Sequence, residues 1–208
     1  MNHWSNFTRE EIKILRILST PIKIQDFLNK VPINFSKNGD TLYSPGRMLR
    51  ERKAHCMEGA LFAAATLWFH GKKPLLMDLR TTQEDSDHVV ALFREGKRWG
   101  AISKTNHIVL RFREPVYASP RELAMSYFHE YFLDTGIKTM RSFSRPFDLS
   151  RGVRKDWMTT EDDLWEIAIA LDDSPHENVL VKGQVRRLRK ADSIEIQAGK
   201  IEEWRRSK

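Results

Sequence analysis

The sequence of 208 residues contains a single cysteine, Cys56. One cysteine cannot form a disulfide within the chain, which fits a reducing compartment. The longest apolar run without a charge, residues 59–69, falls far short of the ~20 residues that a membrane-spanning helix needs. The first residues lack the apolar segment of a signal peptide. These absences favour a soluble cytoplasmic protein, and we expect no contact with a membrane.

Sequence motifs for metal and phosphate binding are missing as well. No cysteine or histidine pair has the compact spacing of a CxxC or HExxH motif, and there is no glycine-rich phosphate loop. We therefore expect neither a metal nor a cofactor. The sequence also lacks an internal repeat, and its length favours a single domain that comprises residues 1–208.

Basic residues outnumber acidic ones, 35 against 28, which gives a formal net charge of +7. Much of the excess lies in residues 182–208, where nine Lys or Arg residues accompany four acidic residues. A basic tail of this kind binds nucleic acid in some proteins and is only a solvated face in many others. Nucleic-acid binding by this tail is therefore a minor hypothesis, because it rests on charge alone.

The helix and strand signals are segregated along the sequence, which predicts an α+β protein. Ser119-Pro120 places a capping residue before a proline, and the helix that it opens should continue to about Phe132. A further helix should begin at Thr160, since acidic residues follow it in the first turn. The expected parts are N-terminal helices in 1–44, a core at about 45–113, a C-terminal helical part at 116–181 and the basic tail at 182–208.

The central element of the core is predicted to be a buried helix that starts near Cys56. Residues 57–69 are almost all apolar, and a helix that is apolar on every side must be buried. Gly71 and Pro74 then end the helix. Runs rich in β-branched and aromatic residues follow, and they predict a small antiparallel sheet packed on the helix. The expected strands are 75–80, 87–94, 97–103 and 108–113.

Cys56 and His88 are candidates for a nucleophile and its general base. The thiolate is the reactive form of cysteine, and a helix N-terminus lowers the pKa of a thiol. His88 opens the strand expected at 87–94, on the same face as Val90, and could take the proton of a nucleophilic thiol. The backbone amide of Cys56 could also stabilise an oxyanion. The alternative is structural, since an unreactive cysteine packs like a small apolar residue.

Three short segments together resemble the core of the transglutaminase-like superfamily, which belongs to the papain-like cysteine fold. They are residues 55–60 (His-Cys-Met-Glu-Gly-Ala), 87–93 (Asp-His-Val-Val-Ala-Leu-Phe) and 99–103 (Trp-Gly-Ala-Ile-Ser). The family pattern has a cysteine at the start of a central helix, a histidine on a strand and an acidic residue shortly after a tryptophan on the next strand. The likeness is to bacterial members of unassigned function and not to the protein cross-linking enzymes.

The resemblance implies a cysteine nucleophile at Cys56 and a histidine base at His88, but the third position departs from the family pattern. Ser103 stands where the family has an aspartate. A carboxylate both orients a histidine and stabilises its charge, whereas a hydroxyl can only orient it. Asn106 and Asp78 are alternative partners for His88, so the residue that orients His88 is left open.

Two functions follow from this sequence. The first is a cysteine-dependent acyl transferase or hydrolase that acts on an amide or thioester of a peptide or small molecule. In that case Arg50, Arg52 and Trp99 are candidates for substrate binding, and the basic helix that carries the arginines favours an acidic substrate. The second is a binding module for a peptide or nucleic acid that keeps the fold and has lost the chemistry, which the serine at position 103 favours.

Overall fold

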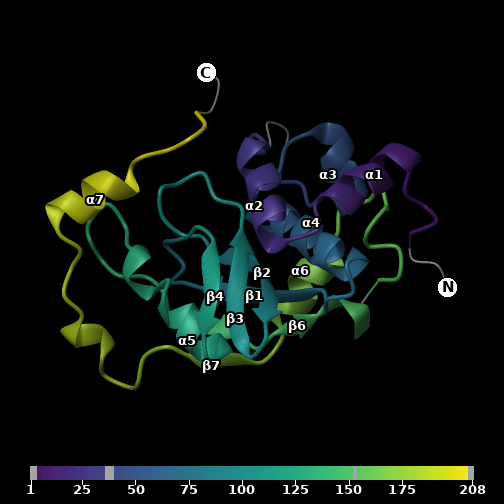
Figure 1. Ribbon diagram of the computed structural model, residues 1–208. Helices are drawn as coiled ribbons and strands as arrows, with labels where there is room; N and C mark the ends of the chain where they lie inside the picture. Colours follow the sequence, from purple (N-terminus) through teal and green to yellow (C-terminus); the bar gives the residue numbers. More distant parts are fainter. Residues whose placement is uncertain (1–3, 36–39, 152–153, 206–208) are drawn as a thin grey trace.

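Helices and an antiparallel sheet together make up the structure, a computed structural model that describes residues 4–35, 40–151 and 154–205 (Figure 1). The α+β class predicted from the sequence is confirmed. The helices are α1 (Arg9–Ile17), α2 (Pro21–Lys30), α3 (Pro45–Glu51), α4 (Cys56–Phe69), α5 (Pro120–Met125), α6 (Trp165–Asp172) and α7 (Ser193–Gly199), with short 3-10 turns η1 (Phe128–Glu130), η2 (Leu149–Arg151) and η3 (Val185–Arg187). The strands are β1 (Leu75–Arg80), β2 (His88–Glu95), β3 (Arg98–Ser103), β4 (Arg113–Tyr117), β5 (Ser142–Ser144), β6 (Phe147–Asp148) and β7 (His176–Asn178).

The sheet has the strand order β4-β3-β2-β1-β5-β7. Strand β6 also pairs with β1, at residues 75–76, whereas β5 pairs with β1 at residues 79–80. All of these pairs are antiparallel. Gly96 connects β2 to β3 with a φ of +56°, a backbone conformation that glycine adopts without a steric penalty. The β2–β3 hairpin fixes the register that matters for function, because it pairs Val90 with Ser103.

Helix α4 is buried along almost its whole length, as its apolar sequence predicts. Every residue from Met57 to Leu67 is buried. Its alanines and Gly59 leave room for close packing, and α4 lies against β2 on one side and against α3 and α2 on others. Figure 1 shows α1–α4 gathered on one side of the strands, while α7 lies at the opposite side of the molecule.

The sheet is covered on both faces, so its central strands have few polar side chains. One face, with Leu76, Ala91 and Ile102, shares a core cluster with the N-terminal helices and α4. The other face, with Met77 and Leu92, packs against α5 and the aromatic residues that follow it. Two buried faces explain why β1 and β2 read as continuous apolar runs.

The C-terminal part of the chain returns to the segment that follows β3. Ile108 N donates to Ile201 O at 3.1 Å, and Glu203 N donates to Asn106 O at 2.9 Å. Part of the expected basic tail therefore packs against the core, and residues 206–208 of that tail lie outside the described residues. Among the helices of the described chain, none combines the length and the apolar character needed to cross a membrane.

Four of the expectations differ from the structure. The helix expected to continue to about Phe132 ends at Met125, and the part expected to be helical at 116–181 also contributes β5, β6 and β7 to the sheet. The helix expected at Thr160 begins at Trp165 instead, because Thr160 and Asp162 bind the side chain of Arg154. The strand expected at 108–113 is also wrong, since β4 begins at Arg113 and the preceding residues form a loop. Leu110 in this loop has a φ of +60°, which an extended strand does not allow.

Candidate active site

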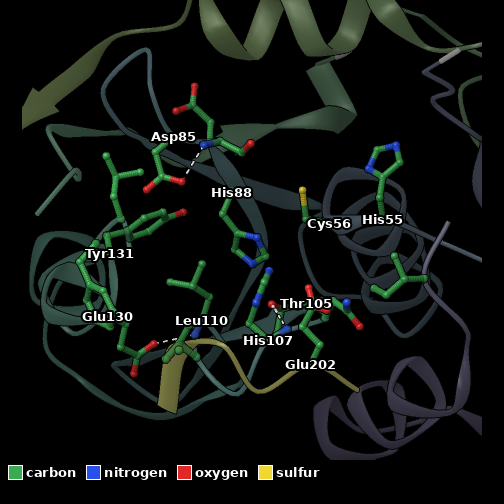
Figure 2. Close-up of a pocket in the computed structure, with 18 of the residues that line it drawn as sticks. His55, Cys56, Asp85, His88, Thr105, His107, Leu110, Glu130, Tyr131 and Glu202 are labelled. Carbon is green, nitrogen blue, oxygen red and sulfur yellow. Dashed lines mark hydrogen bonds between the residues drawn. The ribbon is translucent and has the colours of Figure 1, made fainter. Parts of the chain in front are cut away.

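A cavity of about 570 Å³ lies at the N-terminal end of α4, where β2 begins (Figure 2). Cys56 and His88 both line it, together with His55. Its other walls come from the loop after β3, from residues 130–134, which begin at the last residue of η1, and from the C-terminal residues 196, 199 and 202. Segments that are distant in the sequence therefore enclose the only cysteine of the chain.

Cys56 is the first residue of α4, and the start of the helix is fixed by a carboxylate three residues on. His55 is the cap residue, with extended backbone, and its N–H donates to Glu58 Oε2 at 2.9 Å. Cys56 is partly exposed to the cavity. The sulfur is thus placed at the positive end of a helix, where the dipole favours an anion.

The charge of this site depends on two imidazoles beside the thiol. Burial raises the pKa of Cys56, but hydrogen bonds and charge interactions with His55 and His88 outweigh it, so the pKa lies well below its ordinary value. Burial also lowers the pKa of His55, yet its interactions with Cys56, Glu58 and Thr41 O raise it to about 9. A thiolate beside a positively charged His55 is therefore the favoured state at neutral pH.

Glu58 is a buried carboxylate, with an exposure of 0%, that holds the start of α4 to the preceding loop. It accepts hydrogen bonds from Asn34 Nδ2 at 3.1 Å, Thr41 Oγ1 at 3.0 Å and Tyr43 N at 3.0 Å, besides that from His55 N. The ring of His55 lies 3.4 Å from Glu58 Oε1 and supplies the opposite charge. Such a buried charge is tolerated because it is paired and fully hydrogen-bonded.

His88 is held by Ser103, the residue that replaces the family aspartate. The two side chains share a sheet face, because Val90 pairs with Ser103 and His88 lies two residues before Val90. His88 Nε2 lies 2.7 Å from Ser103 Oγ, and the same hydroxyl donates to Leu110 O. A hydroxyl has one hydrogen, so Ser103 must accept from His88 Nε2–H. The nitrogen of neutral His88 that can take a proton is then Nδ1.

The backbone of Ser103 is fixed by a buried glutamine of α2. Gln25 Oε1 accepts from Ser103 N at 2.9 Å, and Gln25 Nε2 donates to Ser103 O at 2.8 Å. Gln25 is 78 residues away in the sequence, so no local motif points to it. The contact positions the hydroxyl that orients His88.

The two alternative partners of His88 are engaged elsewhere. Asn106 exchanges two hydrogen bonds with the backbone of Trp204, at 2.9 and 2.8 Å, and so attaches the C-terminal segment to the core. Asp78 accepts from His176 Nε2 at 3.1 Å. Of Ser103, Asn106 and Asp78, it is Ser103 that contacts His88 in this structure.

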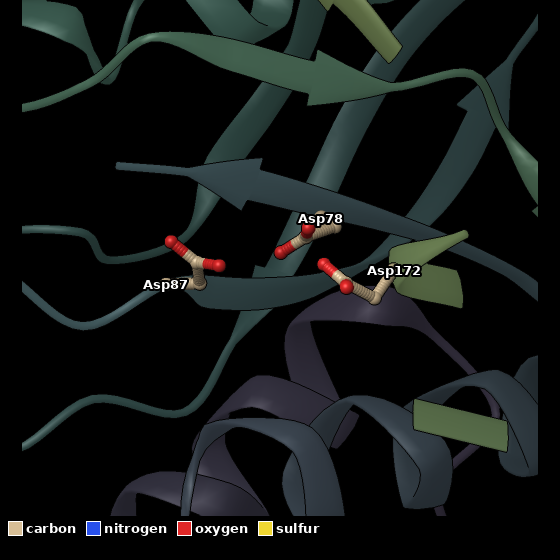
Figure 3. Close-up of side chains that lie close together, drawn as sticks. All are labelled: Asp78, Asp87 and Asp172. Atoms are coloured by element: carbon tan, nitrogen blue, oxygen red, sulfur yellow. The ribbon is translucent and has the colours of Figure 1, made fainter. Parts of the chain in front are cut away.

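Asp78 belongs to a group of three carboxylates whose oxygens lie within 4.8 Å of one another (Figure 3). The others are Asp87 and Asp172. Burial raises the pKa of Asp78 to about 6, and His176 opposes this effect. Arg80 binds Asp172 and lies 4.0 Å from Asp78. Protein cations thus already offset much of the negative charge, and we assign no metal to this group.

The residues expected to bind substrate lie away from this cavity. Arg50 pairs with Glu11 at 2.7 Å and with Glu161. Arg52 is the exposed C-cap of α3, with a φ of +54°, and Trp99 lies along β3. None of these three residues lines the cavity of Cys56. Arg50 contacts acidic partners on α1 and before α6, which the local sequence does not show.

Carboxylates, and not arginines, dominate the charge of the cavity wall. The acidic lining residues are Asp85, Asp87, Glu130, Asp134 and Glu202. Glu130 is paired with Arg113 at 2.6 Å and Asp134 with Lys200 at 3.3 Å, so the acidic character of the wall depends mostly on Asp85, Asp87 and Glu202. Lys104 also lines it, but its ammonium donates to Leu28 O and Val31 O and so points into the protein. Burial lowers the pKa of Lys104 to about 8. The expectation of an acidic substrate therefore loses its structural basis.

No protein-family model matches this chain, and no curated protein matches it either. The resemblance of its three short segments to the transglutaminase-like superfamily therefore stays a prediction. The case for a function rests on the arrangement of Cys56, His88 and Ser103.

Proposed function

We propose that the protein is a cysteine-dependent acyl transferase or hydrolase with a transglutaminase-like, papain-like core built from α4 and β1–β3. The observation that carries the proposal is that Cys56 and His88 line one cavity while Ser103 holds His88 by its Nε2 atom. The low pKa of the Cys56 thiol supports it, because a thiolate is the attacking form.

In the proposed reaction, His88 Nδ1 takes the proton of the Cys56 thiol, and the resulting thiolate attacks the carbonyl carbon of an amide or thioester. A C–S bond forms, and the carbonyl electron pair moves to oxygen. The intermediate collapses when His88 Nδ1 donates a proton to the leaving group, which departs and leaves a thioester on Cys56. Water or another acceptor then gives a proton to His88 and attacks the thioester, so that the C–S bond breaks and the thiolate returns.

Ser103 makes this site electrostatically different from one with an aspartate. Its hydroxyl orients His88 but does little to stabilise a charged ring. The buried pair of His55 and Glu58 supplies charge on the other side of the sulfur, with His55 Nε2 3.4 Å from Glu58 Oε1. We infer that this pair helps to keep the sulfur ionised.

The acidic lining of the cavity favours an acyl substrate that is neutral or positively charged. Asp85 and Asp87 lie on the loop directly before His88, and no arginine lines the cavity in the described chain. An anionic substrate would meet unfavourable charge there. A peptide with basic residues or a small amine-bearing molecule fits this wall.

The proposal is tested by acylation of the full-length protein with p-nitrophenyl acetate, followed by p-nitrophenol release and by intact mass. The wild type should gain one acetyl group on Cys56 and then release it, whereas Cys56→Ser should gain none. His88→Asn should slow acylation by roughly 10²–10⁴-fold, the usual contribution of a general acid–base. His129→Asn, at an exposed histidine outside the cavity, is the matched control and should react like the wild type.

The same experiment decides between the enzyme and the binding module. The neutral Ser103 favours the module, because it leaves the histidine without a counter-charge. A binding module predicts no acetyl-enzyme above the level of His88→Asn, while the fold and thermal stability of the wild type stay intact. That result would contradict the proposed enzyme.

A further inference from the structure

Tyr131 has a buried hydroxyl without a hydrogen-bond partner. The side chain is 3% exposed, and within the described part of the chain only Tyr131 Oη and Trp204 Nε1 are buried side-chain polar atoms with no partner. A buried polar group in this state destabilises the folded protein. Its presence therefore calls for an explanation, and a function in which the hydroxyl gains a partner provides one.

The hydroxyl points toward the cavity of Cys56. Tyr131 lines that cavity, and Figure 2 shows its hydroxyl directed into it from the wall opposite Cys56. The ring belongs to the core cluster with Phe128, Met140 and Phe143, so its position is fixed by packing. A rigid donor is thus aimed at the space in front of the nucleophile.

The protonation state of Tyr131 suits a hydrogen-bond donor. Burial raises its pKa well above the ordinary value, and negative charge at Cys56 raises it further. The hydroxyl therefore keeps its proton when the sulfur is ionised. This electrostatic interaction also agrees with the placement of both groups around one cavity.

A second donor is available on the other side of the reacting carbon. The N–H of Cys56 is the first of α4 and has no acceptor within the helix. An oxyanion that forms during attack needs donors that are in place before the reaction. The helix start and the Tyr131 hydroxyl come from opposite walls and could meet the same oxygen.

We propose that Tyr131 Oη donates a hydrogen bond to the oxyanion that forms when Cys56 attacks the substrate, an inference that rests on the proposed function. The C–S bond forms, the carbonyl π electrons become a lone pair on oxygen, and that oxygen accepts hydrogen bonds from Cys56 N–H and Tyr131 O–H. The phenol keeps its proton throughout. When the C=O bond re-forms, the leaving group departs with a proton from His88.

The test compares Tyr131→Phe with Tyr127→Phe in the full chain. The hydroxyl of Tyr127 is also buried, but it donates to Arg111 O at 3.1 Å and lies outside the cavity lining. Acylation of Cys56 by p-nitrophenyl acetate passes through an oxyanion, whereas alkylation by iodoacetamide displaces iodide and does not. A change in the ratio of the acylation rate to the alkylation rate therefore reports on stabilisation of the oxyanion and not on the reactivity of the thiolate.

Tyr131→Phe should lower the acylation rate by about 10²-fold or more, the usual loss for one oxyanion donor, and leave the alkylation rate unchanged. Its melting temperature should equal or exceed that of the wild type, because an unpaired hydroxyl is removed. Tyr127→Phe should melt at a lower temperature and acylate at the wild-type rate. A structural role for Tyr131 does not predict slower acylation in a more stable protein.

Two results would overturn the inference while the proposed function stands. One is acylation of Tyr131→Phe at the wild-type rate, which means that the hydroxyl does not act in the transition state. The other is an equal loss of acylation and alkylation, which means that Tyr131 acts through the position or ionisation of Cys56. A wild type that alkylates with an ordinary thiol midpoint and is not acylated would overturn both proposals.

Discussion

The thiol of Cys56 lies beside two imidazoles whose other partners differ in charge. His55 Nε2 donates to Thr41 O at 2.8 Å and lies near the carboxylate of Glu58. His88 Nε2 instead meets the neutral hydroxyl of Ser103. A carboxylate stabilises a charged imidazole much better than a hydroxyl does. We therefore infer that His55 stays positively charged beside the thiolate, while His88 takes the thiol proton and exchanges it with the leaving group and the acceptor.

His55→Asn should raise the pKa of the Cys56 thiol. The substitution removes a hydrogen bond and a positive charge that both favour the thiolate. Loss of a nearby opposite charge shifts a pKa by about 1–3 units, so the midpoint of iodoacetamide alkylation against pH should move upward by that amount. His129→Asn serves again as the exposed control, and circular dichroism checks that the variant folds. An unchanged midpoint would mean that His55 does not hold the sulfur in its ionised form.

At the residue scale, the sequence points to Cys56 and His88 as candidate site residues, but it does not point to the residues that support them. Cys56 precedes a long apolar run, and His88 begins a β-branched one, so both stand out locally. The supporting residues can be recognised only from contacts between segments that are separated in the sequence. These residues are Gln25, Tyr131 and Glu58, and Gln25, for example, contacts Ser103 across 78 residues. A glutamine, a tyrosine and a glutamate carry no such signal in isolation.

At the scale of elements, Gly59 allows α4 to pack tightly against the segment after β3. A Cβ atom at this position would lie 2.4 Å from Lys104 Cβ and 3.0 Å from Lys104 Cγ. Lys104 cannot easily retreat, because its ammonium is bound to carbonyl oxygens of Leu28 and Val31 at the end of α2. The first turn of α4, which carries Cys56, is therefore held at a fixed distance from the loop that follows Ser103.

Gly59→Ala should destabilise the protein in spite of the better helix propensity of alanine. Propensity alone favours alanine by about 1 kcal/mol in a helix interior. Overpacking of a rigid buried contact usually costs about 1–3 kcal/mol, and the added Cβ would clash with atoms close to the Lys104 backbone. Urea unfolding should therefore show a lower free energy of unfolding for the variant. A variant as stable as the wild type, or more stable, would show that α4 and Lys104 can move apart.

The elements that the sequence predicts best are those defined by apolar runs. The strand expected at 75–80 is β1 itself. The strand expected at 87–94 is shifted by one residue from β2, and the one expected at 97–103 begins one residue before β3. The prediction failed where hydrogen bonds from side chains outside the segment decide the backbone conformation. Arg154 holds the residues before α6 out of a helix, and Ser103 and Glu130 hold Leu110 in its left-handed conformation.

At the scale of the whole molecule, the net charge of the chain does not predict the charge of the residues that line the cavity. The net charge is +7, yet acidic residues line the cavity, and Arg50 pairs with acids outside it. The C-terminal segment contributes Ile196, Gly199 and Glu202 to the cavity wall. Residues 182–208, which have the composition of a solvated basic tail, thus form part of the wall of the candidate active site. Composition alone could not reveal this position.

Folding brings the sulfur of Cys56 and the imidazoles of His55 and His88 to one cavity, and the reactivity of the thiol should depend on that assembly. In the unfolded chain the three groups are solvated, so the thiol should titrate near the ~8.5 of a free cysteine. In the folded protein the thiolate is stabilised, so its alkylation should already be near its maximum at lower pH.

The most direct measurement is therefore the rate of Cys56 alkylation by iodoacetamide between pH 4 and 10, in buffer and in 8 M urea, with mass spectrometry as the readout. We expect a midpoint well below ~8.5 in buffer, a return to about that value in urea, and an upward shift in His88→Asn. Equal midpoints in buffer and in urea, unaffected by His88→Asn, would contradict the account.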